Sequence, residues 1–268
     1  MKVLSLGAGV QSTTLALMAA SGAFQEMPDC AIFADTGAEP NSVYDHLNKL
    51  KKCLPFPVHI VSGGNITNDL LQGTNSGGKK RFAAVPYFLD RGKNGIGMGR
   101  RQCTKEYKII PIHKKIREIL GYEPRARIPK DAAEVWIGIS TDEIIRMKPS
   151  QVAWIKNRWP LIEIGVSRHK CLEWLSNNNW DAPKSACTFC PFRSNESWQN
   201  MKKNDPESFE QAVLVDHAIR NGVHSKILNA VPYIHRSCKP LDEVDLRSAT
   251  EKGQIDMFLN DCEGMCGV

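Results

Sequence analysis

The chain has 268 residues, of which 42% are hydrophobic and 24% charged, and its formal net charge is +6. These values are typical of a soluble globular protein and exclude a disordered chain, a collagen and a coiled coil. The length suits one large domain, or a core domain with a smaller region attached. A net charge of +6 permits a nucleotide or a nucleic acid as partner without requiring one.

No run of 18 uninterrupted apolar residues is present, so we expect no membrane span. The first residues resemble a signal peptide only superficially, because four polar residues at positions 11–14 interrupt the apolar stretch. The nine cysteines are an odd number spread along the chain, which in a cytosolic protein indicates metal or redox chemistry rather than a disulfide framework. We therefore expect a cytoplasmic protein without a membrane partner.

Short apolar runs alternate with helical segments in the first part of the chain. Helices are predicted at residues 13–20 and 41–52. Strands are predicted at residues 2–6, 30–34, 58–61 and 135–139. Continuous apolar strands that alternate with helices predict a parallel sheet with helices on both faces, which is an α/β Rossmann-like fold.

Two regions depart from this alternation. Residues 73–99 contain seven glycines and several basic residues, so we interpret residues 73–100 as a mobile basic loop or lid. After residue 165 the pattern is mainly helical, with helices predicted at 168–177, 195–203 and 206–221. We therefore expect an α/β domain over residues 1–165 and a helical C-terminal region over residues 166–268, with a cysteine-containing tail.

A glycine-rich turn joins the first predicted strand to the first predicted helix. Gly7 and Gly9 allow backbone N–H groups to converge on an anion, and the start of the helix adds further donors. Gln11, Ser12 and Thr13 add polar side chains. The Walker A pattern is absent, and the Rossmann pattern fails because Ser12 stands where a glycine is required. A plain turn without a ligand is the alternative.

Polar motifs follow two other predicted strands. Asp35, Thr36 and Gly37 end the second strand, where side chains face the ligand crevice of a parallel sheet. The alternative is that Asp35 caps the next helix. The motif after the fourth strand is expected at the same crevice and comprises Gly138, Ser140, Asp142, Glu143 and Arg146.

These motifs, in this order, resemble the PP-loop adenine nucleotide α-hydrolase-like superfamily, and within it the phosphoadenosine phosphosulfate (PAPS) reductase-like family of prokaryotes and their phages. The usual loop is Ser-Gly-Gly-x-Asp-Ser; here Ala8 stands at a glycine position and Gln11 at the aspartate. Residues 33–40 and 159–162 resemble further family motifs, and the match covers residues 3–195. The resemblance implies that the loop binds the phosphates of ATP or PAPS, with Mg²⁺ if the nucleotide is ATP, in a prokaryotic cell or a phage-infected host.

Cys187 and Cys190 form a CxxC motif, and Cys103 lies 84 residues before it. Both thiolates of such a motif can bind one metal ion or cluster. Members of the superfamily have a Cys-Cys pair at about this distance, and the four cysteines bind a [4Fe-4S] cluster. The resemblance therefore implies three ligands here, with a structural zinc site or a redox dithiol as alternatives. Either one iron is open or a fourth ligand comes from Cys171, Cys238, Cys262 or Cys266.

Residues 79–130 form a basic segment, with 15 Lys and Arg against 4 Asp and Glu, a local net charge of +11. The segment overlaps the glycine-rich loop and surrounds Cys103. A basic loop beside a nucleotide crevice predicts a polyanionic acceptor such as a nucleic acid. Tyr87 and Phe88 are candidate stacking faces for a base. The alternative is a solvated basic surface.

The resemblance implies an enzyme that uses ATP for adenylation-dependent sulfur transfer to a nucleic acid or a small acceptor. Lys108 would stabilise developing negative charge, and a sulfur donor or thiol reductant protein would be a further partner. The first alternative is reduction of PAPS or adenosine phosphosulfate (APS), with Cys262 or Cys266 as nucleophile. The second alternative is a zinc-stabilised protein that binds nucleotide or nucleic acid without catalysis.

Overall fold

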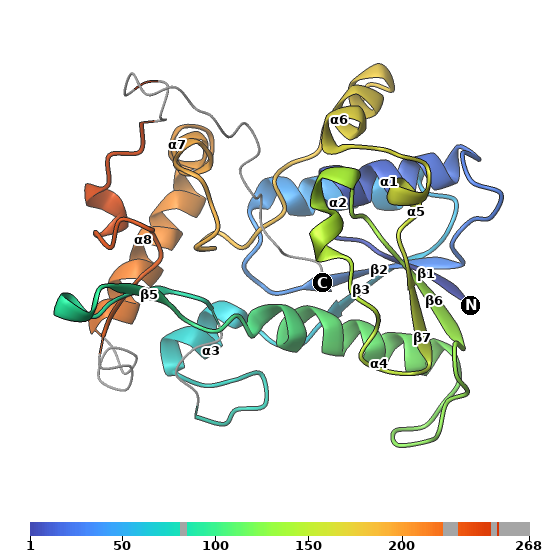
Figure 1. Ribbon diagram of the computed structural model, residues 1–268, viewed down its shortest axis with the longest axis horizontal. Helices are drawn as coiled ribbons and strands as arrows, with labels where there is room; N and C mark the ends of the chain where they lie inside the picture. Colours follow the sequence, from blue (N-terminus) through green and yellow to red (C-terminus); the bar gives the residue numbers. More distant parts are fainter. Residues whose placement is uncertain (81–84, 222–229, 248–250, 252–268) are drawn as a thin grey trace.

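The computed structural model describes residues 1–80, 85–221, 230–247 and 251. At its centre is a five-stranded parallel sheet with the strand order β3-β2-β1-β6-β7 (Figure 1). The strands are β1 (Lys2–Ser5), β2 (Cys30–Asp35), β3 (Val58–Ser62), β6 (Ala133–Ile137) and β7 (Ile155–Arg158). The predicted α/β Rossmann-like fold is confirmed.

Helices cover both faces of this sheet (Figure 1). On one face Leu4 and Phe33 share a core with three helices, whereas on the other face Val3 and Ile32 share a core with Ile112 of α4. Because both faces are covered, consecutive residues in the middle of the central strands are apolar, as at Val3 and Leu4 of β1 and at residues 31–34 of β2. The helices are α1 (Val10–Ala20), α2 (Asn41–Cys53) and α6 (Arg168–Asn177) on the first face, and α4 (Ile110–Ile119) on the second.

Shorter helices complete the α/β part and longer ones form the C-terminal region. A π-helical turn at Thr104–Ile109 runs directly into α4, and 3₁₀ turns occur at Gly92–Asn94, Thr141–Arg146 and Leu241–Glu243. The other helices are α3 (Ile66–Gln72), α5 (Pro160–Glu163), α7 (Asn195–Asn204) and α8 (Pro206–Asn221). The predicted helices at 168–177 and 206–221 are confirmed with the same bounds. None of the described helices is long and apolar enough to cross a membrane.

A second sheet was not predicted. It is antiparallel, with the order β5-β4-β8, and consists of β4 (Phe88–Asp90), β5 (Ile96–Met98) and β8 (Val231–Tyr233). Segment 73–100, interpreted as a loop, therefore contains a β-hairpin, with residues 81–84 outside the described part. Strands of three residues are too short to show an alternating pattern. Through β8 the hairpin pairs with the C-terminal region, and the boundary at residue 165 stays a prediction.

Candidate functional site

A cavity, here called the loop cavity, opens at the carboxyl ends of the central strands. Its walls include Ser5 at the end of β1, Ala34 in β2 and Ile137 at the end of β6. The chain leaves β1 through α1 to reach β2 on one side, while β6 pairs with the other side of β1. Open parallel sheets bind ligands where the strand order reverses in this way. The loop cavity therefore lies where this fold class holds its ligands.

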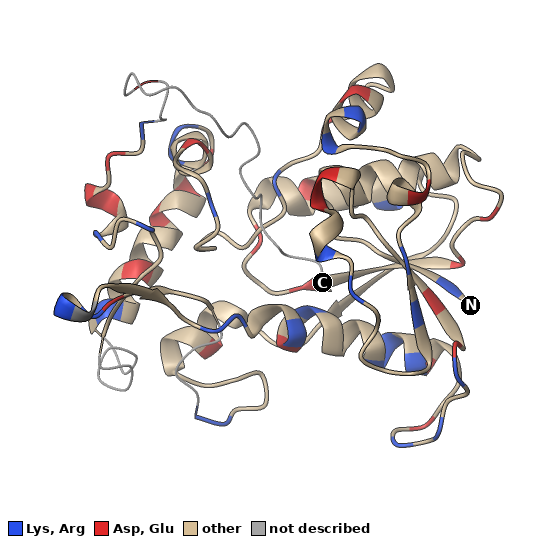
Figure 2. Ribbon diagram, viewed as in Figure 1, with Lys and Arg blue, Asp and Glu red and all other residues tan. Residues whose placement is uncertain are grey.

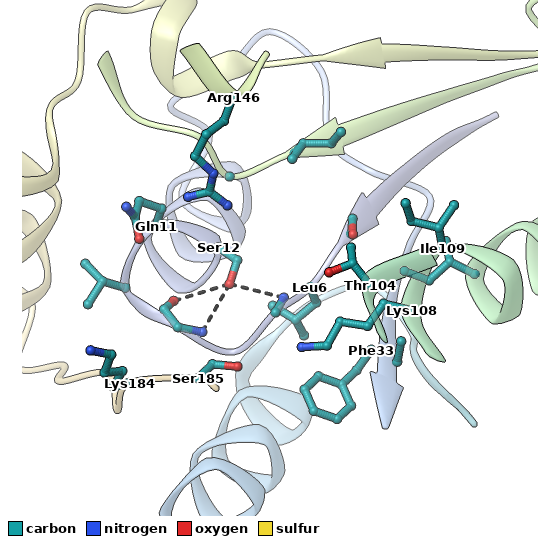
Figure 3. Close-up of a pocket in the computed structure, with 18 of the residues that line it drawn as sticks. Leu6, Gln11, Ser12, Phe33, Thr104, Lys108, Ile109, Arg146, Lys184 and Ser185 are labelled. Carbon is teal, nitrogen blue, oxygen red and sulfur yellow. Dashed lines mark hydrogen bonds between the residues drawn. The ribbon is translucent and has the colours of Figure 1, made fainter. Parts of the chain in front are cut away.

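The glycine-rich turn forms one wall of the loop cavity, with Ser12 at its centre (Figure 3). Ser12 Oγ accepts hydrogen bonds from the backbone N–H groups of Gly7 and Gly9, both at 3.2 Å, and donates to the Gly9 carbonyl at 3.2 Å. Backbone N–H groups that converge on one oxygen atom are the arrangement that binds anions. The N-terminus of α1, which starts at Val10, adds positive partial charge at the same place.

Two backbone features allow the turn to take this shape. A Cβ at Gly138 would lie 2.8 Å from both the Cα and the N of Ser12, so only glycine lets the end of β6 approach the turn. Ala8 has a φ of +55°, in the left-handed region that favours glycine. This backbone conformation explains why a glycine is usual at that position in the loop that the sequence resembles.

The loop cavity is lined by cationic side chains, and no Asp or Glu is among the described residues that line it. Figure 3 shows Lys108 and Arg146 reaching toward Ser12 from opposite sides. Arg146 pairs with Glu143 at 2.5 Å, and its Nε is buried without a hydrogen-bond partner. Such a cavity favours a polyanion. The cations are Lys108, Arg146, Arg168 and Lys184.

This donor set does not fit a magnesium ion held by the protein. Mg²⁺ binds oxygen ligands and is held in proteins mainly through carboxylates, whereas the polar side chains of these walls are hydroxyl, amide and cationic groups. Two of the four cations already pair with carboxylates, Lys108 with Glu39 and Arg146 with Glu143. Mg²⁺ bound to the nucleotide alone stays a prediction.

Gln11 connects the turn to the motif that follows β6 and to α6. Its Nε2 donates to Glu143 Oε2 at 3.1 Å and to Ser140 Oγ at 3.5 Å, and its Oε1 accepts from Arg168 Nη1 at 3.1 Å. Ser140 Oγ in turn donates to Asp142 Oδ2 at 3.1 Å. The predicted motif residues thus lie beside the turn, but Ser140, Asp142 and Glu143 do not line the cavity. Through their hydrogen bonds and an ion pair, these three residues hold Gln11, Arg146 and Arg168 in position.

Four more residues that were predicted to bind the nucleotide do not line the loop cavity either, namely Thr13, Asp35, Thr36 and Gly37. Thr13 is fully buried, and its Oγ1 lies 2.9 Å from Nε2 of His46 in α2, whose pKa is lowered by burial. Asp35 Oδ1 accepts hydrogen bonds from the Gly37 N–H and the Tyr44 hydroxyl, both at 2.8 Å. Burial and the bond to Asp35 raise the pKa of Tyr44. These contacts of Asp35 stabilise the turn and α2, but Asp35 does not cap α2 as the alternative proposed, because the N-cap of α2 is Pro40 and receives no side-chain cap bond.

A second cavity, here called the cysteine cavity, is lined by Cys103, Cys187 and Cys190. Cys103 immediately precedes the π-helical turn, and the CxxC motif lies in the loop before α7. None of the three forms a disulfide. Much of the remaining wall is apolar and includes Val85 and Phe189. Cysteines separated by 84 residues in the sequence are therefore neighbours in one cavity.

The three thiols fit a soft metal or an iron–sulfur cluster by donor type. In the arrangement seen, however, the described residues contain no group of three His, Cys, Asp or Glu side chains placed to hold a metal ion. The [4Fe-4S] cluster and its zinc alternative both stay predictions.

The candidates for a fourth ligand lie elsewhere. Cys171 is fully buried in the core shared by α1 and α6, and burial raises the pKa of its thiol to about 11. Cys238 follows β8, and burial raises its pKa as well. Neither lines the cysteine cavity. Cys262 and Cys266 lie outside the described residues.

The two cavities share a wall formed by Thr104 and Lys108, which line both. These residues are four apart on the π-helical turn, and π-helical turns are frequent at functional sites. Lys108 Nζ lies 3.3 Å from Oε1 of Glu39, whose side chain is fully buried. Thr36 was predicted to bind the nucleotide, but it lines the cysteine cavity. Its Oγ1 lies 3.4 Å from Cys187 Sγ there.

Sequence reasoning missed the residues that the C-terminal region contributes to the loop cavity. Arg168 begins α6, and Lys184 and Ser185 lie three and two residues before Cys187. A Cβ at Gly9 would lie 3.4 Å from Ser185 Cβ, so this segment passes close to the glycine-rich turn. The one available signal was the position of Lys184 only three residues before Cys187.

The basic segment 79–130 is distributed rather than concentrated. Figure 2 shows its Lys and Arg residues along the β4–β5 hairpin, on α4 and in the loops beside them. Tyr87, predicted as a stacking face, is fully buried, so this prediction is wrong for Tyr87. The alternation of a strand explains the difference, because Phe88 points to the opposite side and is partly exposed.

No protein-family model matches this chain, and no curated protein matches it. The resemblance to PP-loop proteins of the PAPS reductase-like family therefore rests on the motifs themselves. The fold and the placement of the motifs are features of the structure, and the activity is a proposal.

Proposed function

We propose that this chain is an adenine nucleotide-dependent enzyme that adenylates an acceptor and transfers sulfur to it. The nucleotide phosphates bind in the loop cavity and the sulfur chemistry takes place at the cysteine cavity. The observation that carries this proposal is the wall of Thr104 and Lys108 that both cavities share. This wall has a cavity lined by cations on one side and a cavity lined by three thiols on the other.

The first step is activation of the acceptor. When the nucleotide binds, the N–H groups of Gly7 and Gly9, which otherwise donate to Ser12 Oγ, donate to phosphate oxygens, while Arg146 and Lys108 compensate the phosphate charge. An acceptor oxygen attacks the α-phosphorus, the bond to the β-phosphate oxygen breaks, and pyrophosphate leaves with the negative charge that develops. The acceptor oxygen, a poor leaving group, has then become part of AMP, a good one.

The second step is displacement of AMP. A nucleophilic sulfur from the cysteine side attacks the acceptor carbon, a C–S bond forms, and the C–O bond breaks as AMP takes the electron pair. Lys108 stands at the shared wall, where it stabilises charge on the departing phosphate. Apolar residues such as Val85 and Phe189 keep water from the activated carbon. A [4Fe-4S] cluster bound by Cys103, Cys187 and Cys190 would supply a position for the sulfur, which comes from a donor protein or thiol.

Anaerobic purification followed by iron, zinc and sulfide analysis tests the proposal, together with an assay of ATP conversion in the presence of sulfide and candidate acceptors. We expect bound iron, the visible absorption of a cysteine-ligated cluster, and AMP plus pyrophosphate formed only when an acceptor is present. Stoichiometric zinc without AMP formation from any acceptor overturns the proposal in favour of non-catalytic binding.

The same preparation distinguishes sulfonucleotide reduction. Release of sulfite from PAPS or APS, lost when the chain is truncated after Asn260, supports that alternative, whose nucleophiles Cys262 and Cys266 lie outside the described residues. Sulfite release that survives the truncation contradicts a tail nucleophile. Neither result is expected if the chain transfers sulfur after adenylation.

A further inference from the structure

The small sheet β5-β4-β8 has two different faces. Leu89 of β4 pairs with Pro232 of β8, and both are buried, with Leu89 in the core that also contains residues of α8. Side chains alternate along a strand, and residues paired across strands share a face. The opposite, outer face therefore consists of Phe88, Asp90, Ile96, Met98, Val231 and Tyr233.

This outer face is apolar and accessible. Ile96, Met98 and Val231 are 60%, 42% and 39% exposed. Phe88 is paired with Met98 on one side and Tyr233 on the other, so three large side chains form a row across the sheet. Contiguous exposed apolar side chains of this kind mark interaction sites in soluble proteins.

Basic residues lie at two ends of the outer face. Lys93 lies in the turn between β4 and β5, Arg100 follows β5, and both are exposed; Figure 2 shows basic residues at this turn. The guanidinium of Arg91 lies instead over Gly97, on the face that Leu89 occupies. The face carries one acidic side chain, Asp90, whose Oδ1 accepts a hydrogen bond from the Gly92 N–H at 2.8 Å. Aromatic rings within a basic rim match a single-stranded nucleic acid, because bases stack on the rings and phosphates meet the cations.

The hairpin is also connected directly to the cysteine cavity. Val85 and Pro86, which precede β4, line that cavity, and so do Arg101 and Cys103, which follow β5. Arg101 Nη2 is buried without a hydrogen-bond partner. The β4–β5 hairpin thus begins and ends at the walls where the sulfur chemistry is proposed.

We propose that the outer face of the small sheet binds a single-stranded segment of nucleic acid and presents it to the cysteine cavity. Bases stack on Phe88 and Tyr233, and Lys93 and Arg100 compensate the phosphates. The role of the bound strand as sulfur acceptor rests on the proposed function, whereas its binding does not. A duplex is bound more weakly, because its bases are already stacked on one another.

Fluorescence anisotropy with labelled single-stranded RNA, single-stranded DNA and a duplex of the same sequence tests this proposal on the full chain. Replacing Phe88 and Tyr233 together by Leu removes the rings but keeps apolar side chains, and we expect about fivefold weaker binding or more. The pair Lys93→Glu and Arg100→Glu should weaken binding by about tenfold and lower the slope of affinity against salt. The matched pair Lys51→Glu and Lys52→Glu, exposed at the end of α2, should change it less than about twofold.

Three results would overturn the proposal: duplex binding as tight as single-strand binding, normal binding by the Leu double variant, or equal losses in the two charge-reversed pairs. If the Leu double variant unfolds at a lower temperature, Met98→Ser, at an exposed position of the same row, replaces it, and normal binding by that variant contradicts the assignment. ATP binding by the same preparations separates the two proposals. Loss of ATP binding with intact nucleic-acid binding contradicts only the proposed function, and the reverse contradicts only this inference.

Discussion

The loop cavity and the cysteine cavity lie on two sides of the same helical turn but are lined by different chemistry. The loop cavity is built from strand ends, converging N–H groups and four cations, whereas the cysteine cavity combines three thiols with apolar walls. The first suits a hydrated polyanion and the second a soft, dry group. In the proposed reaction the two cavities divide the labour, and Lys108, present in both walls, connects charge stabilisation to sulfur chemistry.

The largest effect is expected from the thiols. Replacing Cys103, Cys187 or Cys190 by Ser removes a soft donor from the cysteine cavity, so bound iron should be lost almost completely while ATP affinity is retained. The control is Cys53→Ser. Cys53 is exposed at the end of α2, so the protein with this substitution should keep its bound iron. Iron analysis and isothermal titration with ATP measure both quantities. If all four variants contain the same amount of iron, the three cysteines of the cysteine cavity do not hold it, and the proposed difference between the two cavities is wrong.

Replacement of Lys108 tests the role of the wall that the two cavities share. The variant Lys108→Met leaves the fully buried Glu39 without its cation, and we expect a loss of about 3–5 kcal/mol in the free energy of unfolding. Adding Glu39→Gln should restore most of the stability but not AMP formation, which should stay about 100-fold reduced or lower. Urea unfolding and product analysis check this. Recovery of activity in the double variant would show that Lys108 acts only through folding.

The geometry of the phosphate turn is tested by two glycines. In Gly138→Ala the new Cβ would meet Ser12 backbone atoms at 2.8 Å, so we expect about 1–3 kcal/mol lower stability and weaker nucleotide binding. In Gly9→Ala the nearest atom lies at 3.4 Å, an ordinary contact, and the loss should be clearly smaller. Thermal unfolding and ATP titration of the two variants provide the measurement. A larger loss for Gly9→Ala would contradict the packing described for β6.

The smallest expected effect is a change in the stability of the fold with pH. Burial lowers the pKa of His46, which contacts Thr13 behind the turn, below the ordinary 6.5. The unfolded chain therefore binds this proton more readily, and stability should fall as the pH drops from about 6.5 toward the folded-state pKa, by up to about 1.4 kcal/mol per unit of pKa difference. His113 contributes in the same direction, since burial lowers its pKa too. Urea unfolding at pH 7.5 and 5.5 should show a smaller loss in His46→Gln than in the unchanged chain; equal losses would assign the pH dependence elsewhere.

The central sheet could be predicted because its strands are apolar on both faces, as in the run at residues 30–34. β7 was missed because Ile155–Arg158 is an edge strand with three polar residues, and it carries no apolar run. β4, β5 and β8 were missed because three-residue strands are specified by their partners across the sheet rather than by local pattern.

The site could be predicted where a motif is local and not where it depends on tertiary packing. The glycine turn and the CxxC motif are readable along the chain, and both line the cavities found. The inward orientation of Thr13 toward His46 depends on how α1 packs on α2, which no local pattern records. Arg168 and Lys184 reach the loop cavity only because the C-terminal region folds back over the phosphate turn.

The shared wall is tested most directly by alkylation of the cysteines with and without ATP, followed by mass spectrometry of each site in the iron-free protein. We predict that saturating ATP changes the modification rate of Cys103, Cys187 and Cys190 severalfold. The exposed Cys53 should react at an unchanged rate, and Cys30 should stay slow because burial raises its pKa to about 11. If ATP binds at saturation and the three cavity cysteines react as they do without it, the two cavities are not one functional site.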